Sequence, residues 1–242
     1  ELLLLKSYSY LKKSKLKKIY FIGDKNLFKK LFYKYNNVEK FKFIHIDCSN
    51  NWTAYLKKII QTSSELFNDK KIKYIINLPL NKKKFFKNQY NGFTEFFSMT
   101  LDNKKNENML LFNKNFSVCP LTTHIEIKKV ESQINKAKLV NTIKNLIYFY
   151  KTIIKKKIQI VVLGLNPHAS KDLPKNNKDI KVVSKVIRNL KDKVDIKGPV
   201  SADTAFNKTK SKVYIGMYHD QVLIPFKMKN KFDGLNITIG KK

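Results

Sequence analysis

Residues 158–168 read IQIVVLGLNPH, and this stretch shows the pattern on which the fold prediction depends. Its first part is strongly apolar, which predicts a buried strand, and the strand feeds directly into the turn Asn166-Pro167-His168. Further strands are predicted at residues 18–24, 41–47 and 72–77, with apolar residues at helical spacing after the first two. Because strands alternate with helices, the sequence predicts an α/β fold with a largely parallel sheet.

The second half of the chain continues this alternation and adds two long helical patterns. The predicted strands lie at residues 108–112, 116–121 and 213–217, and the predicted helices at residues 140–154 and 182–190. The character of the sequence changes after Lys82, although no Gly- or Ser-rich linker marks the place. We therefore predict two domains, an α/β domain in residues 1–82 and a second α/β domain in residues 83–242.

Composition excludes several classes of protein. The 242 residues are 43% hydrophobic, which is enough for one large domain or two small ones with real cores. No stretch approaches the roughly 18–20 uncharged apolar residues that a membrane-spanning helix needs. Cys48 and Cys119 lack the spacing of a disulfide or zinc-finger framework. A soluble, cytoplasmic protein without a membrane partner is therefore expected.

The net charge of +32 suggests a polyanion as partner, but the residue types argue against one. Nearly all of the positive charge is lysine, spread along the whole chain beside Asn, Ile, Phe and Tyr, and Arg188 is the one arginine. Arginine reads guanine edges and clamps phosphates with two-point contacts that lysine does not reproduce. We interpret the charge as a compositional bias of the surface, and a basic nucleic-acid-binding protein is the alternative.

The histidines carry the most information about function. His124, His168 and His219 each follow an apolar predicted strand, whereas His45 lies inside one. Ligands of α/β sheets bind beyond the carboxyl ends of the strands, and imidazole is a common ligand of divalent metals. Asp220 directly follows His219 and can fix its tautomer or complete a metal shell. We therefore predict a metal site with three histidine ligands, the alternative for each being a hydrogen-bonded turn histidine.

Six short motifs occur in a fixed order around these histidines. They are VCPLTTHI (118–125), GLNPHA (164–169), GPVSADT (198–204), MYHDQ (217–221), IPFK (224–227) and LNITIG (235–240). The series resembles the successive motifs of the 4-hydroxythreonine-4-phosphate dehydrogenase family. The resemblance continues upstream through residues 91–97 and, more loosely, through residues 78–82.

The resemblance implies a two-domain α/β/α architecture similar to isocitrate and isopropylmalate dehydrogenases, with the active site in the cleft between the domains. It also implies a divalent metal (Zn²⁺, Mg²⁺ or Co²⁺) held by His124, His168 and His219. In the family the third ligand comes from the partner subunit, so a homodimer with a shared metal site is expected. Asp203 and Asp220 match acidic residues near the metal and are the implied catalytic residues.

The resemblance further implies a reaction and its substrate contacts. NAD or NADP takes hydride from 4-phosphohydroxy-L-threonine, a small phosphorylated substrate, in the synthesis of pyridoxine 5'-phosphate (vitamin B6). Thr94, Lys227 and Asn236 match family residues that contact this substrate. No GxGxxG motif follows a predicted strand, so the sequence does not place the residues that bind the cofactor.

Some positions depart from the family pattern. Phe93 stands where the family has a substrate-contacting histidine, and the loop at residues 170–178 lacks the usual glycines and glutamates. Glu1 matches the last residue of a family segment, and the sequence stops soon after Gly240, before a substrate-binding arginine, so truncation at both ends is expected. The alternatives are a dehydrogenase of the threonate or erythronate 4-phosphate type and a catalytically impaired fragment.

Overall fold

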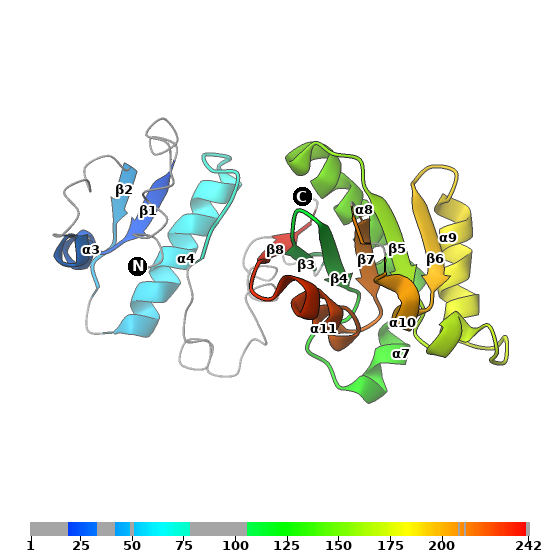
Figure 1. The fold of residues 1–242 in the computed structure, drawn as a ribbon. Helices are drawn as coiled ribbons and strands as arrows, with labels where there is room; N and C mark the ends of the chain where they lie inside the picture. The colour runs from blue at the N-terminus through cyan, green and yellow to red at the C-terminus, as the bar shows by residue number, and fades with distance from the viewer. Residues whose placement is uncertain are drawn as a thin grey trace. The chain divides into compact units, whose positions relative to one another are not determined.

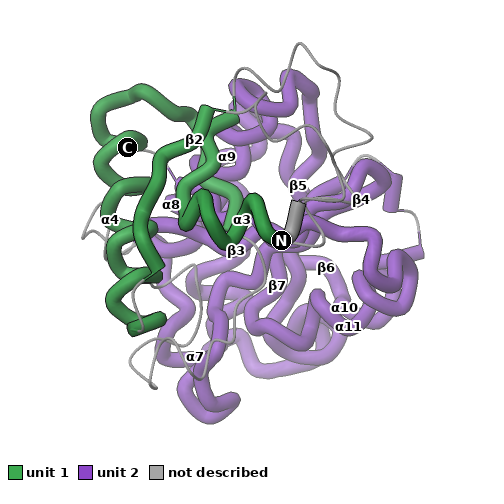
Figure 2. The backbone as a smooth tube through the Cα atoms, turned by 90° about the vertical axis from the view of Figure 1, so that its left-hand side faces the viewer, with its two compact units in different colours: residues 1–92 green, residues 93–242 purple. Residues whose placement is uncertain are grey.

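The computed structural model describes residues 19–32, 42–48, 51–77, 106–207, 209–210 and 212–240. The chain divides into two compact units, Glu1–Gly92 and Phe93–Lys242, shown in green and purple in Figure 2. The boundary predicted after Lys82 lies among residues 78–105, outside the described residues, and stays a prediction. In the described part of the chain, no helix combines the length and the apolar character that a bilayer-crossing segment needs.

The described residues of the first unit form a parallel pair of strands and two helices. Its elements are β1 (Tyr20–Gly23), α3 (Lys25–Phe32), β2 (Lys42–His45) and α4 (Trp52–Asn68). The strands predicted at residues 18–24 and 41–47, and the helical segments that follow them, are therefore confirmed. The rings of Phe21, Phe28 and Phe43 have centroids 5.3 to 6.4 Å apart and form the small apolar centre of this unit.

The prediction of a strand at residues 72–77 is wrong. These residues follow α4 without strand structure, and in the described part of this unit β1 and β2 pair only with each other. Tyr74 and Ile76 are 60% and 87% exposed. A strand is stabilised when its apolar side chains pack against neighbouring elements, and these two side chains lack that burial.

The second unit is built on a six-stranded sheet with the strand order β6-β5-β7-β4-β3-β8. The strands are β3 (Asn108–Phe112), β4 (Phe116–Pro120), β5 (Gln159–Leu163), β6 (Ile196–Val200), β7 (Lys212–Gly216) and β8 (Leu235–Ile239). β6, β5, β7 and β4 pair in parallel, whereas β3 is antiparallel to both β4 and β8. Of the six strands β3 alone runs against the others, which confirms a largely parallel sheet.

Helices cover both faces of this sheet, as Figure 1 shows. One layer contains α8 (Lys136–Tyr148), α9 (Lys185–Leu190) and the π-helical segments η3 (Phe149–Ile154) and η5 (Asp179–Ser184), and the other contains α10 (Ala202–Ala205) and α11 (His219–Asn230). Side chains alternate along the strands, so Ile160 and Ile215 pack toward the first layer and Val161 and Tyr214 toward the second. The predicted α/β fold class is confirmed as an α/β/α sandwich.

Three short helical turns complete the second unit. They are η2 (Ile127–Lys129), α7 (Val130–Gln133) and η4 (Pro167–Ser170). The sequence patterns also miss helix α11 and strands β6 and β8. Helix α11 contains Pro225, a residue that usually breaks a helix interior. Strand β6 contains Gly198 and Pro199, which strands disfavour, but β6 lies at the edge of the sheet, where a proline is tolerated.

Replacing Leu146 with alanine should lower the free energy of unfolding by about 2–5 kcal/mol, because this α8 side chain is fully buried in the core. Urea unfolding followed by circular dichroism measures the change. Lys144→Ala, at an exposed position of the same helix, is the control and should stay within about 0.5 kcal/mol of the parent. A loss below about 1 kcal/mol for Leu146→Ala would contradict this packing.

Candidate functional site

Three histidine-bearing turns leave neighbouring strands of the second unit. β5, β7 and β4 are adjacent and parallel, so their carboxyl ends meet at one edge of the sheet, and His168, His219 and His124 follow them in that order. The turns after β4 and β7 are joined directly, because the Thr122 hydroxyl donates a hydrogen bond to the Met217 carbonyl at 2.7 Å. The fold thus places the predicted ligands along a single edge.

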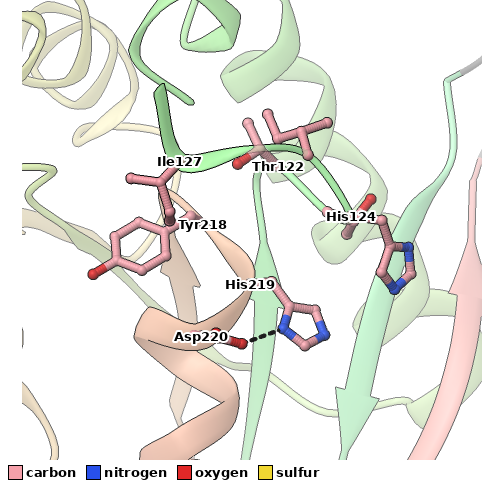
Figure 3. Close-up of a pocket in the computed structure, with 8 residues that line it drawn as sticks. Thr122, His124, Ile127, Tyr218, His219 and Asp220 are labelled. Carbon is pink, nitrogen blue, oxygen red and sulfur yellow. Dashed lines mark hydrogen bonds and ion pairs between the residues drawn. The ribbon is translucent and has the colours of Figure 1, made fainter. Parts of the chain in front are cut away.

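His124 and His219 lie side by side, as Figure 3 shows, with ring centroids 5.5 Å apart and ring planes at 41°. Asp220 lies against the second ring, with its Oδ1 2.6 Å from Nδ1 of His219. A carboxylate only accepts hydrogen bonds, so Nδ1 is the donating nitrogen and Nε2 carries the lone pair that a metal needs. The pair therefore presents adjacent imidazoles, one of them with a fixed tautomer.

A cavity of about 240 Å³ lies beside this pair. It is lined by residues that follow β4 and β7: Thr122, Thr123, His124, Ile125, Ile127, Tyr218, His219 and Asp220. Hydroxyl, imidazole and carboxylate groups thus face the same space as two isoleucine side chains. This mixture suits a small polar ligand that is oriented by a few convergent polar groups.

His168 lies in the turn η4 and does not line this cavity. Its Nδ1 is 3.5 Å from Oδ2 of Asp172, and the two side chains are 66% and 77% exposed, so this ion pair adds little stability. The described residues contain no cluster of three or more His, Cys, Asp or Glu side chains that could hold a metal ion. Within one chain, the structure therefore brings His124 and His219 together and leaves His168 apart.

The turn that carries His168 has an unusual backbone. His168, Ala169 and Ser170 have φ of 55°, 53° and 62°, and left-handed backbone costs roughly 1–2 kcal/mol per non-glycine residue. The fully buried carboxylate of Asp179 holds this turn by accepting hydrogen bonds from the Leu165 N–H and the Ser170 hydroxyl, both at 2.7 Å. The sequence does not reveal Asp179 as a site residue, because the asparagine- and lysine-rich residues before it resemble an exposed loop.

Asp203 stands in the first turn of α10, within electrostatic range of His168 and outside the lining of the cavity. The Ser201 hydroxyl, which bonds to its carboxylate, lowers the pKa of Asp203 below the usual value. The backbone N–H of Thr204 at 2.8 Å and the charge of His168 lower this pKa further, and desolvation opposes the shift. Asp203 is therefore ionised at neutral pH and is available as a charge partner for His168.

Comparison with known proteins shows which family has this arrangement of motifs. Residues 12–242 match the family model described as "Pyridoxal phosphate biosynthetic protein PdxA". The chain belongs to the PdxA family. The resemblance inferred from the six motifs is thereby confirmed.

Relatives within the PdxA family carry two names. A 4-hydroxythreonine-4-phosphate dehydrogenase from Sulfurihydrogenibium sp. (strain YO3AOP1) is 35% identical over 177 residues, which cover 71% of this chain and 55% of the relative. A D-threonate 4-phosphate dehydrogenase from Pectobacterium atrosepticum is 32% identical over 172 residues, which cover 69% of this chain and 52% of the relative. The chain thus spans about half the length of the curated relatives it matches.

A solved structure supports the fold. The crystal structure of 4-hydroxythreonine-4-phosphate dehydrogenase from Klebsiella pneumoniae matches with a TM-score of 0.75 at 22% identity. The match covers 91% of this chain and 78% of the crystallised chain. The PdxA-family fold inferred from the sequence motifs is therefore confirmed.

The predicted substrate-contacting residues of this PdxA-family chain are not gathered at the cavity. Thr94 and Phe93 lie outside the described residues. Lys227 is exposed on α11, and Asn236 is exposed in β8, where it pairs opposite Leu111. Neither Lys227 nor Asn236 lines the cavity beside His124 and His219. Their role in substrate binding stays a prediction.

Replacing Gly164 with alanine should destabilise this chain by about 1–3 kcal/mol, because a Cβ at this position would lie 2.6 Å from the Cα of Ala169. Differential scanning calorimetry measures the change in Tm. Gly240→Ala is the matched control, since the nearest atom to its added Cβ lies at an ordinary contact distance of 3.5 Å. Equal Tm values for Gly164→Ala and the parent would show that the turn after β5 does not pack in this way.

Proposed function

We propose that this chain is a metal-dependent, NAD(P)-linked dehydrogenase that oxidises 4-phosphohydroxy-L-threonine in the synthesis of pyridoxine 5'-phosphate. The product, 2-amino-3-oxo-4-phosphooxybutanoate, is a β-keto acid that loses CO₂ to give 3-amino-2-oxopropyl phosphate. The observation that carries the proposal is the pair of His124 and His219, with Asp220 fixing one tautomer beside a small polar cavity. Membership of the PdxA family and the names of its relatives support the same reaction.

The donor atoms of the site fit a divalent transition metal. Imidazole nitrogens suit Zn²⁺ and Co²⁺, whereas Mg²⁺ prefers oxygen ligands, so we favour Zn²⁺ or Co²⁺. His124, His168 and His219 would hold the ion, and Asp220 would orient His219 through Nδ1. A bound metal would supply Lewis-acid stabilisation of the substrate oxygen that gains negative charge during oxidation.

The two carboxylates implied to be catalytic have different tasks in this proposal. Asp220 occupies Nδ1 of His219, so that Nε2 is the nitrogen left for ligation. Asp203 has its pKa lowered by the Ser201 hydroxyl and remains a carboxylate at neutral pH. A carboxylate with a lowered pKa is a weak base, so we assign Asp203 to orienting His168 rather than to removing the substrate proton. NAD or NADP would supply the hydride acceptor.

We further propose a homodimer with a metal site shared between the subunits. His124 and His219 lie together in one chain, whereas His168 is largely exposed and lies near Asp203 and Asp172. An exposed imidazole outside the cavity is accessible to a second copy of the chain, and this accessibility supports the proposal. In such a dimer the partner's His168 would complete the ligand set that His124 and His219 begin.

Substrate binding in this proposal depends on groups beyond the histidine pair. Lys227 would place a positive charge beside the substrate phosphate, and Asn236 and Thr94 would donate hydrogen bonds to it. The phosphorylated substrate and the nicotinamide cofactor are small metabolites, and we place the protein in the cytoplasm with no membrane or nucleic-acid partner. Apart from Lys227, the lysines of the surface are then solvated and have no role in the reaction.

A second substrate is a specific alternative. The Pectobacterium atrosepticum relative is named as a dehydrogenase of D-threonate 4-phosphate, and it is nearly as similar to this chain as the first relative. Phe93 also replaces a family histidine at a position implied to contact the substrate, which removes a hydrogen-bond donor there. The first substrate carries an amino group where the second carries a hydroxyl group. The loss of one hydrogen-bond donor from the protein can therefore alter which substrate is preferred.

Replacing His219 or His124 with alanine should remove tightly bound metal, because each change deletes one imidazole of the pair. Mass spectrometry of the metal content after equilibration with Zn²⁺ and desalting measures the loss. His45→Ala is the matched control, since its Nδ1 accepts a hydrogen bond from the Lys25 N–H at 3.0 Å and it belongs to the other unit. Unchanged metal content in both His219→Ala and His124→Ala would refute the metal site.

The purified protein should form NADH with a kcat/KM at least about tenfold higher for 4-phosphohydroxy-L-threonine than for D-threonate 4-phosphate, because the relative at 35% identity is named for the first substrate and the exchange of one polar substrate group can produce this discrimination. Initial rates of absorbance increase at 340 nm, with Zn²⁺ present, measure both. The His219→Ala variant gives the background rate. A preference for D-threonate 4-phosphate would reject the first substrate in favour of the second and leave the dehydrogenase class intact.

A further inference from the structure

Asp179 is a fully buried carboxylate that the proposed reaction does not use. It stands at the start of η5, and its two oxygens accept four hydrogen bonds from the turn after β5. Oδ1 accepts from the backbone N–H of Leu165 at 2.7 Å. Oδ2 accepts from the backbone N–H and the side-chain amide of Asn166, both at 3.1 Å, and from the Ser170 hydroxyl at 2.7 Å.

In these contacts both oxygen atoms of the Asp179 carboxyl group must accept hydrogen bonds. The surrounding groups are backbone N–H, amide N–H and hydroxyl, all of which donate, and an ionised carboxylate is the side chain that only accepts. Asp179 is itself held in place. The Ser184 hydroxyl donates to the Asp179 carbonyl at 2.7 Å, and Val183 and Val186 bury the following turns in the core.

The peptide group between Gly164 and Leu165 is held from both sides. Its N–H donates to Asp179, and its carbonyl accepts a hydrogen bond from Nε2 of Gln221 at 2.7 Å. Oε1 of the same glutamine accepts from the N–H of Met217, also at 2.7 Å. One series of hydrogen bonds therefore joins the turn after β5, which carries His168, to the turn after β7, which carries His219.

The turn needs this support because its backbone is one that L-residues rarely adopt. Three consecutive residues from His168 to Ser170 have positive φ, and a turn without an anchor would relax to more common angles and move the imidazole. Gly164 makes room for the turn, since a Cβ there would meet the backbone of Ala169.

We propose that Asp179 is a positioning residue for metal binding: it holds His168 in its left-handed turn and, through Gln221, fixes that turn relative to His219. The inference rests on the proposed metal site, because the position of His168 matters to function only if its imidazole is a ligand. Residues beyond the direct ligands commonly set metal affinity in this manner, with a 10- to 100-fold loss when they are changed.

The test is the affinity of the purified full chain for Zn²⁺, measured by competition with a chromophoric chelator. Asp179→Asn keeps the shape but turns an amide NH₂ toward donors, and should weaken Zn²⁺ binding by about tenfold or more. Ser170→Ala removes one of the four contacts and should weaken binding by a smaller factor, about two- to fivefold. Tyr150→Phe is the matched control, because it deletes a buried hydrogen bond of 2.8 Å to Ser117, at the opposite end of β4.

The outcomes separate a positioning role from a merely structural one. The proposal is supported if Tm is lower in all three variants and Zn²⁺ binding is weaker only in Asp179→Asn and Ser170→Ala. Zn²⁺ affinity equal to the parent in a folded Asp179→Asn overturns it. If Asp179→Asn does not fold, the Zn²⁺ affinity of Ser170→Ala becomes the test. A Zn²⁺ affinity of Ser170→Ala equal to that of the parent then overturns the proposal. Failure of the parent to bind Zn²⁺, or binding unaffected by His219→Ala, rejects the proposed metal site itself, and this inference with it.

Discussion

The parallel pairing of β7 with β5 on one side and β4 on the other is the constraint on which the candidate site depends. The ladders place Val213 opposite Ile160 and Tyr214 opposite Val118, so the three strands end nearly level. A turn that leaves one of these strands cannot shift along the sheet without breaking a buried ladder of hydrogen bonds. Thr122 and Gln221 extend the same constraint into the turns by bonding to the backbone of the neighbouring segment.

Much of this arrangement could be predicted from the sequence because the signals are local. The apolar strand ending at Leu163 and the order of the motifs around His124, His168 and His219 required only neighbouring residues to interpret. The features that the sequence does not predict depend on burial, which is set by residues that are distant in the sequence. Residues 72–77 have the composition of a strand but their apolar side chains remain exposed, whereas Asp179 stands among polar residues and is completely buried.

The spacing of the three histidines along the sequence does not predict how they are grouped in the structure. The resemblance implies three histidine ligands, one of them from a partner subunit, and within one chain the structure gives a pair, His124 and His219, and a separate exposed His168. Each group has carboxylates near it, Asp220 for the pair and Asp172 and Asp203 for the separate histidine. In a chain with 18 acidic residues against 50 basic ones, this placement of carboxylates beside the histidines is informative. It fits the proposed metal site better than three unrelated turn histidines.

Anomalous X-ray diffraction from crystals of the Zn²⁺-loaded protein tests this account most directly. The account predicts one strong zinc peak per chain, at about 2.0–2.1 Å from imidazole nitrogens of His124, His219 and the partner's His168. A peak bound by side chains elsewhere on the chain, or by none of these histidines, would contradict it.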